Sequence, residues 1–353
     1  MQTNQIIRKG LAVGIILLFV ATTGIIPSTA QYIEKPSFPT SRGNWLYVGG
    51  SGPGNYTRIQ DAVDNASAGD TVFVYAGTYR ELVTVRTKVH LVGQSPSTTI
   101  IDGEYKGNVV HIRADGTTMA GFTVQNSRHH IMAAGILVWA NHTSISNCVV
   151  CGNYLGICLR DDTSRNGHNL VRNNWIHHNF WGVKISGNSY NEISNNTIMY
   201  SLAEAIFAAG DFVFPCHHNT IADNILNKNA AGICFSGDTS QMLVTRNIIT
   251  NNVYNGLMLN CWDSVFSWNS IRNSGDFAVL SEESSNNTFL HNDFIEAGTL
   301  LMFVGGHELP DTLRGNYWGR PRILPKIVIG HCYSTILLLQ VDWKPAWKPN
   351  VVI

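Results

Sequence analysis

The chain has 353 residues, with 24 Lys and Arg against 24 Asp and Glu, and 44% of its residues are hydrophobic. A net charge of zero argues against nucleic acid as a partner, because binding to phosphates needs a basic surface. The apolar fraction excludes wholesale disorder. The chain is therefore predicted to fold and not to bind nucleic acid.

The first thirty residues have the pattern of a targeting segment. Two basic residues precede an apolar run over residues 11–26, and small residues at 28–30 suit cleavage by a signal peptidase. The sequence predicts a signal peptide at 1–30 and a linker at 31–45. An N-terminal anchor that is not cleaved is the alternative, since the run approaches spanning length. In both cases the rest of the chain is expected to be secreted or on the cell surface.

Residues 56–81 predict a short helix followed by the first strands. Ile59, Ala62, Val63 and Ala66 fall on one face at helical spacing, so this helix is expected to be amphipathic and to cover the end of the domain that follows. The small and polar residues 77–81 are expected to begin the strands.

From about residue 119 one pattern recurs: an apolar residue, two positions, usually Asn, one position and another apolar residue. The recurring Asn residues are Asn174, Asn196, Asn224, Asn247, Asn269, Asn292 and Asn316. Phe122 and Cys148 occupy the same register in earlier repeats. Each repeat holds three short segments of alternating apolar residues, which is strand chemistry without room for a helix. Such units bury their apolar sides only by stacking on one another.

The repeats therefore predict an all-β fold, a single-stranded right-handed parallel β-helix of about twelve coils with three strands per coil. We place it at residues 46–320, with a C-terminal tail or cap at 321–353. The Asn column is interpreted as a structural ladder of stacked side-chain amides. We expect Asn there because it tolerates the left-handed backbone of a tight bend and because its side-chain amide can bond to the Asn of the next coil.

The segment from Tyr56 to Glu81, the Asn repeats and the ending Gly315-Asn316-Tyr317-Trp318 resemble a known family. They are similar to pectin-lyase-fold proteins, in the NosD-like and carbohydrate-binding branch of secreted proteins. The resemblance covers roughly residues 46 to 320. It implies the fold strongly and an activity weakly, because this fold carries lyases, hydrolases, esterases, adhesins and inert scaffolds.

The resemblance also implies that the strand after each small residue forms the binding face. Alternation along these strands places one residue of each coil in a common outward column, which is unusually apolar for a solvated face. Its members are Leu137, Cys158, Lys184, Phe207, Cys234, Met258 and Leu280. We expect a cover: the tail from Ile327 to Ile353, a loop, a ligand or a second copy, which would make the column a self-association surface.

Acidic residues recur at the turn after this strand. Asp162, Asp211 and Asp238 are the candidate catalytic acids, and Asp211 with Asp238 is the best pair on adjacent coils. Carboxylates about 5 Å apart suit calcium binding or acid–base chemistry, so calcium is the cofactor to consider and no other metal site is assigned. Ordinary turn aspartates are the alternative.

Aromatic and basic residues border the same strand. Tyr154, Trp181 and Tyr254 suit stacking on a sugar ring, and Lys184 and Arg160 complete the candidate substrate-binding set. The partner expected from this set is a polysaccharide or a glycan of the cell envelope. Packing of turn on turn is the alternative for the aromatic residues.

Comparison with the catalytic members of the family is mostly negative. The sequence Asp211-Phe212-Val213-Phe214 resembles an aspartate motif of pectinesterases, and Gly319-Arg320-Pro321 resembles part of their arginine motif, but the companion motifs are missing. Three His pairs, beginning at His129, His177 and His217, raise copper handling through the resemblance to NosD-like proteins. Adjacent residues on a strand face opposite ways, so such a pair is not a chelate by itself.

The sequence favours a secreted or cell-surface β-helix protein that binds carbohydrate or the cell surface without catalysis. A polysaccharide-active enzyme, whether lyase, hydrolase or pectinesterase-like, is the first alternative. A structural scaffold or NosD-like copper handling is the second.

Overall fold

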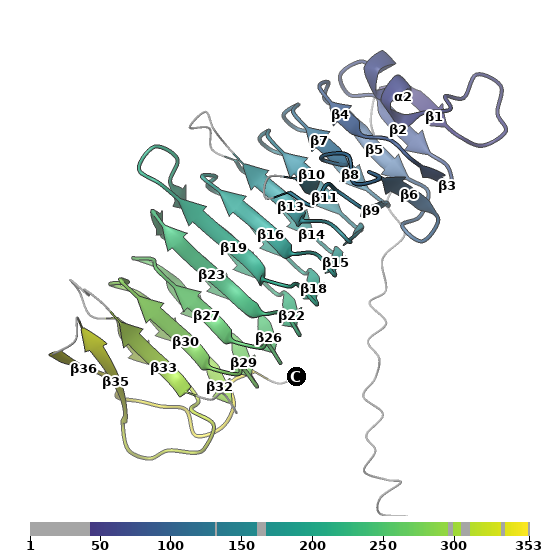
Figure 1. The fold of residues 1–353 in the computed structure, drawn as a ribbon. Coiled ribbons are helices and arrows are strands. Elements are labelled where there is room, and N and C mark those ends of the chain that lie inside the picture. The colour runs from purple at the N-terminus through teal and green to yellow at the C-terminus, as the bar shows by residue number, and fades with distance from the viewer. Residues whose placement is uncertain are drawn as a thin grey trace, which may run out of the picture. The chain divides into compact units, whose positions relative to one another are not determined.

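The computed structural model describes residues 43–130, 133–160, 167–295, 299–304, 311–332 and 336–351. These residues confirm the predicted fold: they form a right-handed parallel β-helix of about 11 turns, close to the twelve expected (Figure 1). The predicted signal peptide at 1–30 and most of the linker at 31–45 lie outside the described residues. No helix in the described part is long and apolar enough to cross a membrane.

Three strands per coil build three sheets. Sheet A has 12 strands in the order β1 (Trp45–Val48), β2 (Thr71–Val74), β5 (His90–Gly93), β8 (Thr118–Ala120), β11 (Ser144–Ser146), β14 (Leu170–Arg172), β17 (Glu192–Ser194), β21 (Thr220–Ala222), β25 (Leu243–Thr245), β28 (Val265–Ser267), β31 (Thr288–Leu290) and β34 (Thr312–Arg314). Sheet B has 10 strands: β3 (Gly77–Tyr79), β6 (Thr99–Asp102), β9 (Thr123–Gln125), β12 (Val149–Cys151), β15 (Trp175–His177), β18 (Thr197–Met199), β22 (Ile225–Asn227), β26 (Ile248–Thr250), β29 (Ser270–Arg272) and β32 (Asp293–Ile295).

Sheet C has the longest strands and carries the predicted binding face. Its 12 strands, from the N-terminal end, are β4 (Val83–Val85), β7 (Val110–Ile112), β10 (Ala134–Val138), β13 (Leu155–Arg160), β16 (Trp181–Ser186), β19 (Glu204–Gly210), β23 (Ala231–Gly237), β27 (Asn255–Leu259), β30 (Phe277–Glu282), β33 (Thr299–Val304), β35 (Lys326–Cys332) and β36 (Ile336–Asp342). A further pair, β20 (Cys216–His217) and β24 (Thr239–Ser240), lies beside it.

The helix α2 (Ile59–Asn65) packs against β1, β2 and β4 at the N-terminal end of the coils. Ile59, Ala62 and Val63 are buried, as the amphipathic pattern predicted. The carboxylate of Glu81 accepts hydrogen bonds from the backbone N–H groups of Ile59 (2.8 Å) and Gln60 (3.0 Å). The helix therefore receives its N-terminal cap from the strand region it covers.

The core is a set of apolar columns that run along the inside of the coils. In sheet A the buried column contains Ile145, Val171, Ile193, Ile221, Val244, Phe266 and Phe289. The rings of Phe266 and Phe289 stack with centroids 4.8 Å apart. Because each coil is registered residue for residue on the next, one apolar position in the repeat becomes a continuous column of packed side chains.

The Asn ladder lies at the corner between sheets A and B. The backbone N–H of Asn174 donates to Oδ1 of Asn196 (3.0 Å), and the Asn174 side-chain amide donates to the same oxygen (3.0 Å). The same pair of bonds links every successive Asn from Asn196 to Asn316. Cys148 stands in the same register, with its N–H on Oδ1 of Asn174. The ladder is structural, as predicted.

Of the two reasons expected for Asn in the ladder, the amide bond to the next coil is confirmed and the left-handed backbone was wrong. The left-handed residue is the one before each ladder Asn, as at Asn173 (φ 56°), Arg246 (φ 54°) and Trp268 (φ 57°). The ladder Asn is selected instead for its buried amide, which satisfies backbone N–H groups that the bend leaves without partners.

The other two corners carry ladders that the sequence reading missed. Asn153, Asn179, Asn229 and Asn252 accept backbone N–H groups between sheets B and C. Between sheets C and A, Asn169, Asn191, Asn219 and Asn287 do the same. All three bends of the coil therefore use one device.

Two buried aspartates end the ladders at the C-terminal end. Asp342 is fully buried and accepts from the N–H of Asn316 (2.9 Å), its side-chain amide (3.1 Å) and Nε1 of Trp318 (3.2 Å). Asp311 accepts from the N–H of Asn287 (2.7 Å). The strands β35 and β36 pair antiparallel and extend sheet C past β33, and β36 packs on β34. The described tail therefore lies at the end of the stack, where it supplies the last acceptors.

Candidate functional site

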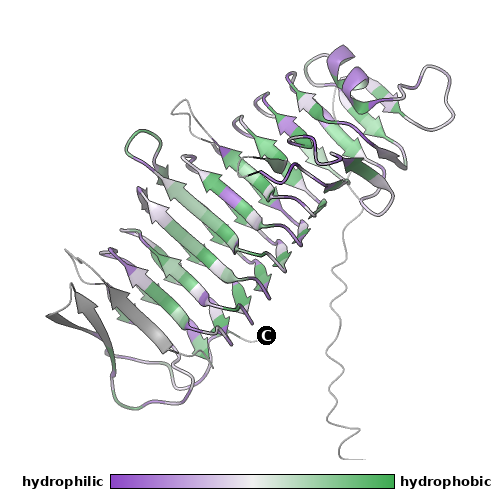
Figure 2. Ribbon diagram, in the orientation of Figure 1, coloured by the Kyte–Doolittle hydropathy of each residue, from purple (hydrophilic) through white to green (hydrophobic). Residues whose placement is uncertain are grey.

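The outward column of sheet C has the register that the sequence predicted. Cys158 pairs with Lys184, Lys184 with Phe207 and Phe207 with Cys234 on successive strands. Leu137, Cys158 and Cys234 retain 8%, 3% and 2% exposure, while Lys184 and Phe207 are half-buried. Hydrophobic colouring runs along the strands of this sheet (Figure 2). The described part of the tail does not lie over this column, because β35 and β36 extend the sheet instead of crossing it.

Aromatic rings surround Lys184 in the middle of this face. Its Nζ lies 5.3 Å from the ring centre of Trp181 and 5.6 Å from that of Phe207, within reach of a cation–π contact with each. The Nε1 of Trp181 donates to the carboxylate of Glu204. Tyr154 meets Trp181 edge to face at 5.6 Å. The predicted residues Tyr154, Trp181 and Lys184 are thus brought together, and Glu204, which sequence reasoning missed, fixes the indole.

Tyr254 lies apart from this cluster. It belongs to the same corner as Tyr154, but the positions between them are filled by Phe180, Ala203 and Ala230 on successive coils. Tyr154 stacks on Phe180 at 4.7 Å, whereas Tyr254 is 55% exposed. Turn-on-turn packing therefore holds for Tyr154, and Tyr254 offers a separate exposed ring.

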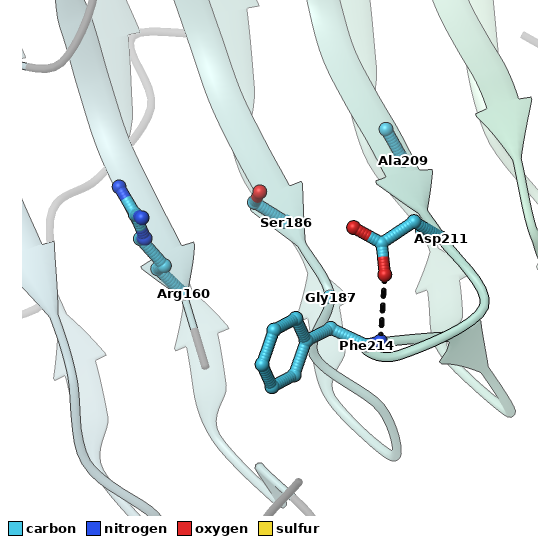
Figure 3. A pocket seen from close by; sticks show the side chains of 7 residues that line it. Arg160, Ser186, Gly187, Ala209, Asp211 and Phe214 are labelled. Carbon is cyan, nitrogen blue, oxygen red and sulfur yellow. Dashed lines mark hydrogen bonds between the residues drawn. The ribbon is translucent and has the colours of Figure 1, made fainter. Parts of the chain in front are cut away.

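A hollow of about 530 Å³ opens where β13, β16 and β19 end (Figure 3). Its lining consists of Arg160, Ser186, Gly187, Ala209, Gly210, Asp211 and Phe214. Arg160 and Ser186 pair across β13 and β16 and are the last residues of those strands, so they lie on the same outward row, two residues beyond Cys158 and Lys184. The hollow therefore continues the Lys184 cluster along the strands, and its volume is within the range of ligand pockets.

The loop after β19 forms one wall of the hollow. Oδ1 of Asp211 accepts the backbone N–H groups of Val213 and Phe214, each at 2.8 Å, and the Phe214 ring extends from the loop towards Gly187 in Figure 3. Phe212 at the loop tip is fully exposed. One Asp211 oxygen is thus used to shape the loop, as the turn-aspartate alternative expects, and the hydrogen bonds described leave Oδ2 for other partners.

Asp211 and Asp238 directly follow Gly210 and Gly237, which pair on adjacent strands, as the sequence predicted. The backbone N–H of Asp238 donates to the carbonyl of Gly210, and its own carbonyl accepts from the N–H of Cys216, so Asp238 lies opposite the inserted loop that begins at Asp211. Asp238 is absent from the lining of the hollow. The third candidate acid, Asp162, lies outside the described residues, as does Asp161.

Burial makes the thiols near this face unreactive. It raises the pKa of Cys216 and of Cys234 to about 12, with smaller contributions from the charges of Asp238 at Cys216 and of Glu204 at Cys234. Both thiols therefore remain protonated at neutral pH, the form that is not nucleophilic.

The three His pairs are separated and engaged with their neighbours. His129 stacks on Tyr105, His178 on Tyr200 and His218 on Tyr190, with ring centroids 4.7 to 5.1 Å apart. Nδ1 of His177 lies 2.8 Å from Nδ1 of His178, and burial together with the His178 charge lowers the pKa of His177. Among the described residues no group of three or more His, Cys, Asp or Glu side chains is arranged to hold a metal ion. Calcium at the acidic turn stays a prediction.

Sequence reasoning missed Ser186 and Phe214. Ser186 could have been found, because it lies two residues beyond Lys184 on the same outward face. Phe214 was quoted only as the last residue of the segment that resembles a pectinesterase motif, and alternation could not place it, because it belongs to an insertion that interrupts the repeat.

Together the coils and the ladders define a parallel β-helix protein with the pectin-lyase fold. The family model described as periplasmic copper-binding protein (NosD) matches residues 63–258 and 216–323, so the chain belongs to this family. This match confirms the resemblance that the repeats indicated.

Individual proteins show where the likeness is strong and where it is confined to the fold. A cell surface glycoprotein of Methanothermus fervidus is 27% identical over 308 residues, which cover 74% of this chain and 51% of that relative; the chain thus spans about half of its length. Two solved structures share the fold. The A-module of the mannuronan C-5 epimerase AlgE6 of Azotobacter vinelandii has a TM-score of 0.55 at 13% identity and covers 82% of this chain and 92% of that one. The pectate lyase Pel9A has a TM-score of 0.52 at 14% identity, with 76% and 77% covered.

Proposed function

We propose that this chain is a cell-surface β-helix protein that binds a polysaccharide on the outer face of sheet C without cleaving it. The name of the cell surface relative and the periplasmic description of the family support a place outside the cytoplasm. The observation that carries the binding role is the continuity between the rings of Trp181 and Phe207 and the polar hollow beside them. A sugar has an apolar ring face and a rim of hydroxyls, and this surface suits both.

The acids of the hollow favour binding over cleavage. Glycoside hydrolysis uses two carboxyl groups about 5–10 Å apart on either side of the scissile bond. Among the described residues that line the hollow, Asp211 supplies the only carboxylate, and Asp238 is not part of this lining. A single carboxylate that shapes its own loop can accept hydrogen bonds from sugar hydroxyls.

The test is a binding and turnover screen of the purified protein against acidic and neutral polysaccharides. Trp181→Ala is expected to weaken binding about tenfold, since loss of one aromatic platform costs roughly 1–1.5 kcal/mol. Trp268→Ala is the matched control, because Trp268 is 44% exposed but lies at the Asn-ladder corner. A thermal melt of each variant shows that it is folded.

Two results would contradict the proposal. Release of new chain ends that stops in Asp211→Asn would make the protein an enzyme. Binding that is equally insensitive to both Trp substitutions would remove sheet C as the binding face.

A further inference from the structure

Lys184 is a half-buried cation on an apolar face, without an anionic partner among the described residues. It stands between Cys158 and Phe207 on the neighbouring strands, and its contacts are with the rings of Trp181 and Phe207. None of the ion pairs within 4.0 Å among the described residues includes it. Glu204, on the adjacent strand, accepts from the indole of Trp181 instead.

Other basic residues of the chain are paired differently. Lys106 contacts Glu104 at 2.6 Å, and Arg246 contacts Asp223 at 2.7 Å, both at exposed sites. Lys184 is less exposed to water than Lys106 and Arg246, and no carboxylate of the described residues lies within 4.0 Å of its ammonium. The two aromatic rings offset part of the lost hydration of the ammonium. The ammonium has three N–H donors, however, and the ring contacts do not satisfy these donors as an oxygen acceptor would.

Further polar groups follow Lys184 along the strand direction on the same face. Ser186 lies two residues further on the same outward face, about 7 Å along the strand, and Asp211 closes the hollow beyond it. A ring bound against Trp181 and Phe207 would therefore meet the ammonium first and hydroxyl-binding groups next.

We propose that Lys184 binds the carboxylate of an acidic sugar, so that the ligand of the sheet C face is a polyuronate. This inference rests on the proposed polysaccharide binding and adds the class of polysaccharide. The carboxylate of a uronate residue pairs with the Lys184 ammonium, while its apolar ring face lies on the aromatic platform. Ser186 and Oδ2 of Asp211 accept hydrogen bonds from hydroxyls of the neighbouring sugar. A neutral polysaccharide of the same linkage makes the stacking contacts but leaves the ammonium unpaired.

The experiment compares binding to polygalacturonate and to polymannuronate with binding to their carboxyl-reduced, neutral forms. The wild-type protein is expected to bind the charged polymers about tenfold more tightly than the neutral ones at low salt, and to lose part of that preference at 0.5 M salt. Lys184→Gln is expected to abolish the preference while it retains binding to the neutral forms. Lys228→Gln is the matched control, because the Nζ of Lys228 also lies over a ring, 5.7 Å from the centre of Tyr200, but on a different corner.

The outcomes separate this inference from the proposal on which it rests. Equal binding of charged and neutral forms by the wild-type protein, or an undiminished preference in Lys184→Gln, overturns the role of Lys184 and leaves polysaccharide binding in place. Absence of binding to all four polymers overturns both. Equal loss of preference in Lys228→Gln assigns the effect to overall charge and also refutes the inference.

Discussion

Asp342 ends the main Asn ladder, and its replacement by Ala is expected to release the C-terminal coils. The substitution leaves five donors without their acceptor: the backbone N–H groups of Gly315, Asn316 and Lys344, the Asn316 side-chain amide and Nε1 of Trp318. Asn316 and Trp318 are buried, and an unsatisfied buried donor costs about 1–3 kcal/mol. Because the five donors share one carboxylate, their costs do not add in full, and we expect a loss of about 4 kcal/mol.

The loss is expected to be local, because each coil of a repeat protein contacts only its neighbours. Hydrogen–deuterium exchange of Asp342→Ala should show loss of protection in β31 and β34 while β2 and β5 keep theirs. Urea unfolding followed by circular dichroism should show an early transition that the wild-type protein lacks. Asp223→Asn is the control; it breaks an exposed ion pair with Arg246 and should change stability by less than about 1 kcal/mol. Uniform loss of protection along the chain, or unchanged unfolding of Asp342→Ala, would refute the capping role.

Three further predictions concern the core and the ladders. Phe289→Ala should destabilise the protein by about 3–5 kcal/mol, and Phe289→Leu by less, in thermal melts, because the buried ring stacks on Phe266; equal effects would contradict the packing argument. Asn224→Ala should cost about 2–4 kcal/mol, since it removes the acceptor of two buried Asn196 donors and the donor to the Ile193 carbonyl, whereas the exposed Asn195→Ala should cost only about 1 kcal/mol, from the strain of Ala at a left-handed φ. Burial raises the pKa of Asp311 to about 6, so its folded-state ionisation is unfavourable. Stability at that end should therefore fall as the pH rises from about 4 to about 6, and Asp311→Asn should flatten this part of the pH profile.

The fold could be predicted because its information is local and repeated. One apolar alternation and one Asn per coil fix the strand register, and the structure reproduces that register from β8 to β34. The capping helix was also readable, since Ile59, Ala62 and Val63 show helical spacing over a single short segment. Both depend on interactions between residues that occupy equivalent places in the pattern.

The second and third ladders escaped the reading because other residues interrupt them. Ser201 takes an Asn position between sheets B and C, and its backbone N–H donates to Oδ1 of Asn229. Met242 takes an Asn position between sheets C and A, and its backbone N–H donates to Oγ of Ser264. A search for Asn at every repeat therefore does not detect a ladder in which other residues replace some of the Asn residues. The reason for Asn was misassigned because sequence shows two adjacent turn residues and does not tell which of them has the positive φ.

The candidate site was only partly predictable. Lys184 and Trp181 follow from alternation, but the hollow depends on the inserted loop over residues 211–215, which appears in the sequence merely as a longer step from Asn196 to Asn224. The pairing of Asp211 with Asp238 was expected from counting coils, and the register of Gly210 with Gly237 agrees with that count. Counting alone does not reveal the inserted loop that begins at Asp211, or that only Asp211 of the two lines the hollow.

The separation of tasks at each bend has a consequence for how this surface can vary. At the A–B corner the ladder Asn holds the bend from inside, while the left-handed residue before it points outward and is in turn Asn173, Asn195, Asp223, Arg246, Trp268 and His291. Acidic, basic, amide and aromatic side chains thus share one backbone conformation. Such a corner presents a row of outward side chains about 4.8 Å apart, and substitutions in this row can change the surface chemistry without changing the backbone of the coil.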